Sequence, residues 1–262
     1  MPILRIATYN IHKGVQGVGP LQRLEIHNLR HAVAQLDADI VCLQEVRAFH
    51  HRLARRFGAH WPHEPQAQVL APPGWFAVYH TNALTRHGEH GNALLSRFEV
   101  LAFAHRDVSD HALEQRGLLH VTLSVPTSPA TQAERAAVAA PQGAQRVLHV
   151  IVVHLGLMHA SRRRQVAALG RYLAEAVPPA APLVVAGDFN DWGEQLHADL
   201  ARLDLHTLTG VRVPTFPARL PLLALDRIYV RGLRVLTLRA PREAPWRRLS
   251  DHLPLVAEVA WG

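Results

Sequence analysis

Cysteine and lysine are nearly absent from this chain of 262 residues, which contains one of each, Cys42 and Lys13. A single cysteine excludes an intrachain disulfide and any zinc centre built from several thiolates. Cys42 lies inside the apolar run 40–43, so we expect a buried thiol that acts as a small hydrophobe rather than as a catalytic group. A single cysteine permits a reducing compartment but does not by itself fix one, and we expect a cytoplasmic location.

Long apolar segments are also missing. No run reaches the roughly 18 to 20 residues of a membrane-spanning helix. Residues 1–9 have the composition of a strand, not of a basic segment followed by an apolar one. We therefore expect neither a signal peptide nor a transmembrane segment, and peripheral membrane association stays open. The chain shows no internal repeat, and nothing in it identifies a protein partner.

Positive charge is abundant, and almost all of it is arginine. The formal net charge is +7, and 27 of the 28 Lys and Arg residues are arginine because Lys13 is the only lysine. A basic surface attracts nucleic acid, anionic lipid headgroups and phosphorylated metabolites without selecting among them. A GC-rich genome produces the same composition. A short helix expected at 49–57 carries Arg52, Arg55 and Arg56, which face either a polyanion or solvent.

The most informative segment is 183–191, where an apolar run ends in Gly187, Asp188 and Asn190. The run has the length and the β-branched content of a buried strand. Because an unpaired buried charge is costly, acid and amide side chains at such a strand end indicate a polar site. On an extended chain Asp188 and Asn190 would face the same side, where they could hold a hard cation, a water or a phosphate.

The same pattern recurs along the chain. Other apolar runs end in Asn10, Glu45 and His154, and further runs follow Asp226 and the Asp251-His252 pair. One such residue alone is more often a turn former or a helix cap, but coincidence does not explain the whole set. If the strand ends meet, eight residues form one cluster: Asn10, Glu45, His154, Asp188, Asn190, Asp226, Asp251 and His252. Oxygen ligands suit Mg²⁺ or Mn²⁺, and Asp with His supplies proton transfer.

The motifs also follow one another in a recognisable order. They are Thr8-Tyr9-Asn10-Ile11, Leu43-Gln44-Glu45-Val46, Gly91-Asn92-Ala93-Leu94-Leu95-Ser96, His154-Leu155, Gly187-Asp188-Phe189-Asn190, Asp226-Arg227-Ile228 and Ser250-Asp251-His252. This set resembles the endonuclease/exonuclease/phosphatase (deoxyribonuclease I-like) superfamily and covers the chain from start to end. The Asn-Ile-His-Lys-Gly segment at 10–14 is similar to short bacterial YbhP-like members.

The resemblance implies an α/β fold, a four-layer α/β/β/α sandwich of two mixed β-sheets flanked by helices. It also implies a metal-dependent phosphoric ester hydrolase, in first place one that cleaves a phosphodiester. Glu45 would be the chief ligand of Mg²⁺ or Mn²⁺. Asn10 would help to place the metal or a phosphate oxygen, and Asp251 would support the metal side of the site.

The remaining roles implied by the resemblance concern catalysis. Asp188 would orient or deprotonate the attacking water, and Asn190 would hold a phosphate oxygen. His252 would contact the phosphate, with Asp226 fixing its tautomer and supporting its positive form. His154 would be a second imidazole that stabilises the transition state or protonates the leaving oxygen. Which histidine acts as acid and which as base stays open.

Three further residues are candidates for substrate binding. Arg116 precedes the expected strand 118–125 and could clamp a phosphate, or it could be an ordinary surface arginine. Asn92 could orient a neighbouring catalytic group or cap a turn. Phe216 could stack on a base, insert near lipid or fill the core. His12 lies where many nuclease relatives carry an acid, which disfavours a second metal and a nuclease.

We expect one domain over 1–262, because the motifs span both halves and a division would separate the site. Within it we expect a helix at 21–36, a loop at 61–90 that borders the cleft, and a flexible insertion at 126–145. The resemblance implies that the substrate is a phosphate ester. Three alternatives to a general phosphodiesterase stay open: a nuclease acting on DNA or RNA, a phospholipid headgroup phosphodiesterase, and a catalytically silent phosphate-binding module.

Overall fold

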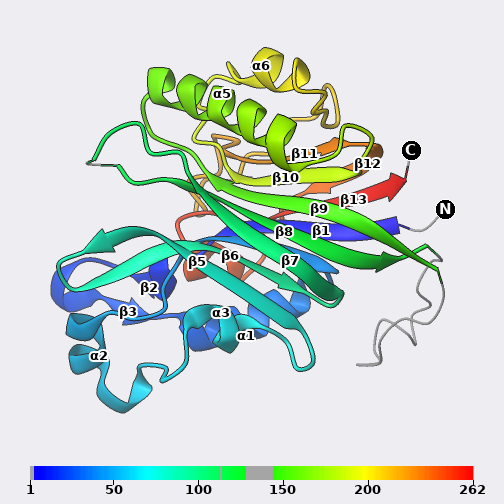
Figure 1. Ribbon diagram of the computed structural model, residues 1–262. Coiled ribbons are helices and arrows are strands. Elements are labelled where there is room, and N and C mark those ends of the chain that lie inside the picture. Colours follow the sequence, from blue (N-terminus) through cyan, green and yellow to red (C-terminus); the bar gives the residue numbers. More distant parts are fainter. Residues whose placement is uncertain (1–2, 113, 128–143, 262) are drawn as a thin grey trace.

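The computed structural model describes residues 3–112, 114–127 and 144–261, and it contains two large β-sheets packed face to face (Figure 1). The first has six strands in the order β12-β13-β1-β4-β6-β5. Their bounds are β1 (Ile3–Asn10), β4 (Ile40–Val46), β5 (Phe76–Thr85), β6 (Gly88–Ser96), β12 (Leu233–Arg239) and β13 (Leu255–Trp261). The second has five strands in the order β11-β10-β9-β8-β7. These are β7 (Glu99–Asp107), β8 (Gly117–Pro126), β9 (Gln145–His154), β10 (Leu183–Asp188) and β11 (Asp226–Arg231).

Helices cover the outer face of each sheet (Figure 1). The first sheet is covered by α1 (Ile26–Gln35), α3 (Gln66–Leu70) and α7 (Trp246–Leu249), and α2 (His51–Phe57) lies at the same side. The second sheet is covered by α5 (His159–Ala176) and α6 (His197–Ala201). A small hairpin of β2 (Val15–Gln16) and β3 (Arg23–Leu24) follows the 3-10 turn η1 (His12–Gly14).

Apolar side chains fill three layers of core between these four layers of structure. Leu4 and Ile6 of β1 face the second sheet, whereas Tyr9 of the same strand packs against the helices. Both faces of the central strands are therefore buried, which explains why their sequences are continuous apolar runs. The expected α/β/β/α sandwich is confirmed. Cys42 belongs to the core between the sheets and is fully buried, as expected.

Strand register brings the polar strand ends together at one edge. β1 and β4 are parallel, with Asn10 opposite Gln44. In the second sheet His154, Asp188 and Asp226 are register partners on three neighbouring strands. Gly187 allows this close pairing, because a Cβ there would lie 1.9 Å from the Val153 carbonyl oxygen. Neighbouring strands thus align side chains that are far apart in sequence.

The prediction of a loop at 61–90 is wrong. This stretch contains α3, all of β5 and the start of β6. The strands β5 and β6 form an antiparallel hairpin at the edge of the first sheet. An edge strand with one solvated face tolerates polar residues such as His80 and Thr81, so the polar composition misled the assignment. The helix expected at 21–36 is shorter, because it begins at Ile26 after the hairpin.

The expected insertion at 126–145 falls mostly outside the described residues. Its first residue, Pro126, closes β8, and its last, Gln145, opens β9. Residues 128–143 lie outside the part of the chain that the structure describes. Within the described ranges, no helix combines the length and the apolar character needed to cross a membrane.

Candidate active site

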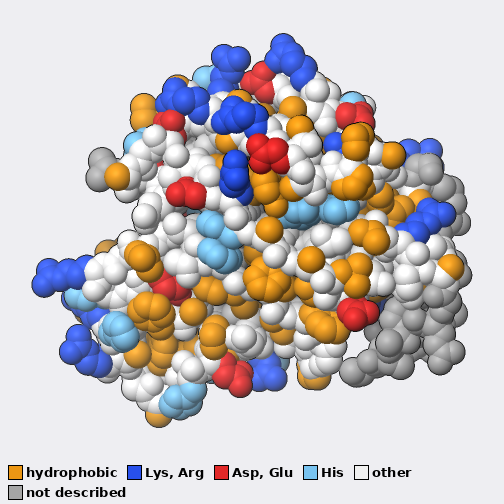
Figure 2. Space-filling model, in the orientation of Figure 1, with side chains coloured by type: hydrophobic (Ala, Val, Ile, Leu, Met, Phe, Trp, Pro, Cys, Tyr) orange, Lys and Arg blue, Asp and Glu red, His pale blue; other side chains and the backbone are white. Residues whose placement is uncertain are grey.

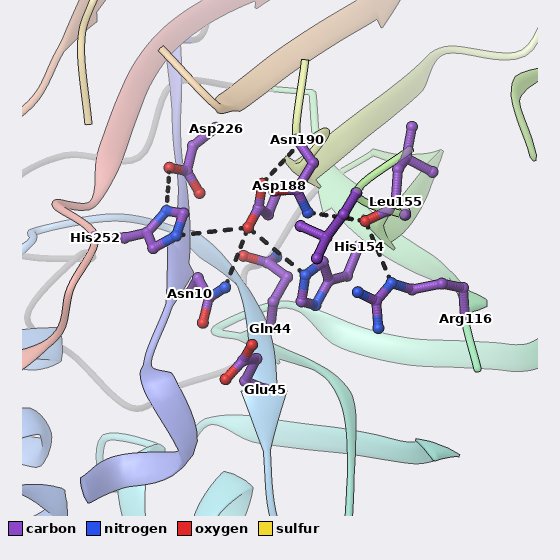
Figure 3. Close-up of polar contacts among 12 residues, drawn as sticks. Asn10, Gln44, Glu45, Arg116, His154, Leu155, Asp188, Asn190, Asp226 and His252 are labelled. Carbon is purple, nitrogen blue, oxygen red and sulfur yellow. Dashed lines mark hydrogen bonds and ion pairs between the residues drawn. The ribbon is translucent and has the colours of Figure 1, made fainter. Parts of the chain in front are cut away.

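Asp188 is the centre of the polar cluster (Figure 3). Its Oδ2 accepts a hydrogen bond from Asn10 Nδ2 at 3.1 Å and lies 3.6 Å from Nε2 of both His154 and His252. Its Oδ1 accepts from the backbone N–H of Asn190 at 2.9 Å. Asp188 is 1% exposed. The structure therefore brings together segments of the chain that are up to 242 residues apart, from Asn10 to His252.

The two histidines beside Asp188 differ in charge. Burial opposes the charge of His252, but the carboxylates of Asp226 and Asp188 outweigh it and raise the pKa of the imidazole. Its Nδ1 lies 2.8 Å from Asp226 Oδ2. Burial and the nearby charge of Arg116 instead hold the pKa of His154 well below its usual value. His252 is thus favoured as an imidazolium and His154 as a neutral imidazole.

The surroundings of Asp188 raise the pKa of its carboxyl group. Burial raises its pKa, and the negative charge of Asp226 adds to the effect, while His252 and the hydrogen bonds from Asn190 and Asn10 oppose it. A carboxylate with a raised pKa is a better proton acceptor near neutral pH than an ordinary aspartate. The arrangement can therefore deprotonate a bound water.

Glu45 reaches the cluster because β4 is irregular at that point. The pairing of β4 with β6 shifts between Leu43 and Val46, and Glu45 has a left-handed backbone with φ of 57°. Such a bulge redirects one side chain. Lys13 Nζ lies 2.7 Å from Glu45 Oε2. Burial alone would raise the pKa of Glu45, but the Lys13 charge outweighs it and holds the carboxyl ionised.

A strained turn places the Lys13 ammonium and the His12 imidazole next to the expected metal ligands. His12 and Lys13 have φ of 46° and 61°, values that L-residues adopt at a cost of about 1 kcal/mol or more. His12 Nδ1 lies 3.1 Å from Asp251 Oδ2, and its backbone N–H donates to Asn10 Oδ1. Of the seven described non-glycine residues with positive φ, four lie at this site: His12, Lys13, Glu45 and Asn190. Backbone strain is thus concentrated where the cluster forms.

The turn also corrects two expectations based on an extended chain. His12 does not continue β1 but turns back onto Asn10. Asn190 has φ of 49°, so it does not share a strand face with Asp188, and its Nδ2 donates to the Leu155 carbonyl at 2.9 Å. Polar side chains that bond the local backbone favour such turns over extended structure.

The donor set fits a hard divalent cation. Glu45 and Asp251 offer carboxylate oxygens, and Asn10 offers an amide oxygen, the ligand types that Mg²⁺ and Mn²⁺ prefer. Both carboxylates already face a positively charged or protonatable side chain, Lys13 or His12. A second group, Asp188, Asp226 and His252, is also compact and buried. We assign that group to proton transfer, because Nδ1 of its imidazole is at hydrogen-bond distance from Asp226.

Arg116 and Asn92 are placed differently from the expected substrate contacts. The guanidinium of Arg116 donates to the carbonyls of Leu155 and Gln115 and to Glu114, so no edge of it is free to clamp a phosphate. Asn92 is 0% exposed, and its Nδ2 donates to the carbonyls of Gly117 and Val152. It ties the two sheets together beneath the site and cannot touch a substrate.

Phe216 lies at the site but not as a free stacking platform. Its ring centroid is 4.9 Å from that of His252, and the side chain is half-buried. The Phe216 ring packs against the His252 imidazole, and part of the ring stays exposed. The remaining expected residues, Asp226, Asp251 and His154, lie within the cluster as expected.

Two residues of the site were missed in the sequence. Lys13 carries a usable signal, because it is the only lysine and lies three residues after Asn10. His90 lies among the charges of Lys13, Glu45, Arg47 and Arg116, and burial together with the positive charges lowers its pKa to about 4. The sequence showed His90 only as part of a histidine-rich segment, with no pattern that linked it to Glu45.

Comparison with known proteins finds relatives in sequence and in fold. A model of the Endonuclease/Exonuclease/phosphatase family matches residues 7–252. The "Uncharacterized protein YbhP" of Escherichia coli (strain K12) is 38% identical over 265 residues, which cover 97% of this chain and 95% of that relative.

Solved structures show the same fold at lower identity. The endonuclease/exonuclease/phosphatase from Bacteroides vulgatus has a TM-score of 0.71 and 21% identity, with 100% of both chains covered. D. rerio TDP2 complexed with single strand DNA product has a TM-score of 0.60 and 14% identity, with 98% of each chain covered. From its family match and its similarity to YbhP, the chain belongs to the Endonuclease/Exonuclease/phosphatase family, whose members are phosphoesterases and nucleases.

Proposed function

We propose that this protein is a divalent-metal-dependent phosphodiesterase that cleaves its substrate by attack of water on a bound phosphate. The observation that carries the proposal is the buried Asp188, which lies 3.6 Å from two imidazoles of opposite charge preference. Family membership supports hydrolysis of a phosphate ester. An in-line displacement at phosphorus needs positioning, charge neutralisation and two proton transfers, and the cluster contains groups for each.

Each side chain has a defined part in this proposal. Asp188 takes the proton of the attacking water, oriented by Asn10 and by the backbone N–H of Asn190. His252, held as an imidazolium by Asp226, neutralises charge on the phosphate and gives its proton to the leaving oxygen. His154 stays neutral and offers a hydrogen bond to the phosphate. One proton is thus taken from water and one is returned to the product alcohol.

The metal would be held by Glu45 and Asp251, with Asn10 beside them. A bound Mg²⁺ or Mn²⁺ supplies positive charge next to a phosphate oxygen. Asn10 belongs to both halves of the site, because its amide nitrogen binds Asp188 while its amide oxygen faces the turn that carries His12. Asn190 and Arg116 act by orienting Leu155 and the neighbouring His154 rather than by holding phosphate.

The remaining candidate functions differ in the phosphate ester that they would cleave. The D. rerio TDP2 structure contains a single-stranded DNA product, which supports a nuclease. A phospholipid headgroup is the other candidate substrate. A catalytically silent module would lack a member of the cluster, and all eight expected residues are present.

The test is a hydrolysis panel with Mg²⁺ or Mn²⁺ on bis-p-nitrophenyl phosphate, duplex DNA, single-stranded RNA and lysophospholipid. We expect at least one phosphodiester to be cleaved. Glu45→Gln should lower the rate by roughly a hundredfold or more, because it removes the charge of the main metal ligand. Glu175→Gln is the control, since Glu175 is an exposed acid of α5 that pairs with Arg106 away from the cluster.

Activity that survives chelation, or that persists in Glu45→Gln, would refute the metal role. If the protein cleaves none of the four substrates, the phosphodiesterase proposal is refuted. Equal losses in Glu45→Gln and Glu175→Gln would show that the effect is not specific to the site.

A further inference from the structure

A groove beside the cluster is lined by basic side chains. It has a volume of about 630 Å³ and lies between α2 and the hairpin of β2 and β3. Its basic lining consists of Lys13, Arg47, Arg52 and Arg56 with His12, His50 and His87, and none of its described lining residues is Asp or Glu. Lys and Arg side chains are prominent on the surface over α2 (Figures 1 and 2). The groove is therefore concave and strongly positive.

The inner end of the groove is the proposed active site. Lys13 lines the groove and lies 2.7 Å from Glu45 Oε2, and His12 lines it and lies 3.1 Å from Asp251 Oδ2. Arg47 follows Glu45 by two residues on the same segment. A substrate whose phosphate lies at Asp188 and Glu45 would therefore have this groove next to it.

No groove arginine forms an ion pair with a carboxylate among the described residues, although the charges of Glu45 and Glu89 act on Arg47. Arg47 Nε is buried without a hydrogen-bond partner there. Arg56 donates to the carbonyls of Gly19 and Pro20 and to Gln22, which are neutral. Some arginines elsewhere pair with an acid, as Arg164 does with Asp110, but many described arginines outside the groove do not. Arg56 is therefore engaged in the way that Arg116 is, and it contributes charge rather than a free guanidinium edge. Arg47 and Arg52, in the same concavity, provide positive charge that a bound anion could neutralise.

We propose that this groove binds the phosphates of a single-stranded nucleic acid next to the bond that is cleaved. The proposal rests on the proposed phosphodiesterase function and names the substrate class. A nucleic-acid strand carries a phosphate on every nucleotide, so phosphates beyond the scissile one would face Arg47 and Arg52. The imidazole rings of His50 and His87, with centroids 6.3 Å apart, add planar surfaces on which bases stack.

A phospholipid fits this groove less well. A simple glycerophospholipid has one phosphate, which the cluster would take, leaving the groove arginines without an anion. The groove offers acyl chains only Val15 and Leu53. A separate cavity of about 620 Å³ beside Asp251 combines Leu21 and Leu220 with four arginines, so it offers an apolar ligand more contact than the first groove does. The charge of the first groove therefore favours a polyanion.

Binding to a fluorescein-labelled oligothymidylate of about six nucleotides, a length within the site size of single-strand binders, tests the proposal. The full-length protein is titrated in EDTA over a series of KCl concentrations, so that binding is measured without cleavage. We expect Arg52→Met to weaken binding about tenfold and to lower the salt slope by about 0.7, the value for one lost phosphate contact on a single strand. Arg55→Met is the matched control, because Arg55 lies on the same helix but not in the groove lining.

A second readout separates the two proposals. The ratio of kcat/KM for a single-stranded DNA or RNA oligonucleotide to kcat/KM for bis-p-nitrophenyl phosphate should fall about tenfold in Arg52→Met and stay at the wild-type value in Arg55→Met. If the wild type cleaves bis-p-nitrophenyl phosphate but Arg52→Met binds the oligonucleotide like wild type, the groove proposal is overturned and the phosphodiesterase stands. If the oligonucleotide binds through Arg52 but nothing is cleaved, the groove stands and the phosphodiesterase fails.

Two further results would also overturn the groove proposal. Equal weakening in Arg52→Met and Arg55→Met would indicate attraction to the basic surface as a whole. Binding to phosphatidylglycerol vesicles that depends on Arg52, with no binding of the oligonucleotide, would assign the groove to a lipid surface instead.

Discussion

The ammonium group of Lys13 lies against the carboxylate that we propose as the main metal ligand. Its Nζ is 2.7 Å from Glu45 Oε2, and the left-handed turn that carries it is fixed by a hydrogen bond from Gln66 Nε2 to the Lys13 carbonyl. The turn therefore holds a positive charge against the proposed main metal ligand. A divalent ion that binds Glu45 must share that carboxylate with Lys13 or displace it.

Removal of the Lys13 charge should therefore tighten metal binding. We expect Lys13→Met to bind Mn²⁺ roughly five- to tenfold more tightly than wild type, which corresponds to about 1 to 1.4 kcal/mol. Isothermal titration calorimetry without substrate measures this directly. Lys13→Arg keeps the charge and should bind Mn²⁺ like wild type. An unchanged affinity in Lys13→Met would mean that the ammonium does not compete for Glu45.

A buried histidine pair joins β8, β9 and α5 on the outer face of the second sheet. His120 Nε2 lies 2.9 Å from His149 Nδ1, and His120 Nδ1 lies 3.0 Å from the Tyr172 hydroxyl. Burial, and then the neighbouring His149, lower the pKa of His120 to about 4. These elements are therefore held together by neutral imidazoles, and protonation works against their packing.

The pair should make stability fall in mild acid. The unfolded His120 titrates near its ordinary pKa of about 6.5 and the folded one near 4, so the unfolded state binds more protons between these values. The free energy of unfolding should drop as the pH falls from about 6.5 to 4, by up to roughly 3 kcal/mol from this group, and no further below that. Urea unfolding across this pH range measures the effect.

His120→Gln keeps a polar side chain that does not titrate, and it should flatten this part of the curve. His63→Gln, at an exposed position, is the control and should leave the curve unchanged. A wild-type curve that is level between pH 6.5 and 4 would contradict the assignment of a neutral buried pair.

At the scale of the whole molecule, the two ends of the chain are neighbours in the first sheet. β1 pairs with β13 on one side, with Ile3 opposite Ala260, and with β4 on the other. The cluster likewise takes residues from β1, β4, β9, β10 and β11. On these grounds we propose that residues 1–262 form one domain, because neither half contains a complete sheet or a complete site.

A single domain should unfold in one cooperative step. We expect the urea transitions followed by far-UV circular dichroism and by tryptophan fluorescence to coincide, since the sheets share one core. Trp246 and Trp261 report on the first sheet and its helices. Two separated transitions, or probes that disagree in midpoint, would contradict the one-domain proposal.

Much of the fold and the membership of the site were accessible from the sequence. Continuous apolar runs indicated strands buried on both faces, and the polar residues at their ends indicated where a site would form. Asp188, His154 and Asp226 were predicted in this way, because a residue at the end of a buried strand must have a polar partner or a function, and the structure places them side by side. The order of the motifs indicated the family and, with it, the two-sheet sandwich.

Only the tertiary structure decided how these side chains act. The left-handed turns at His12, Lys13, Glu45 and Asn190 depend on hydrogen bonds to distant segments, and local periodicity carries no record of them. The pairing of Lys13 with Glu45, the engaged guanidinium of Arg116 and the burial of Asn92 follow from sheet register and from packing across the sandwich. Sequence patterns report which face of an element is apolar, whereas distances between elements arise only when the sheets close on their common core.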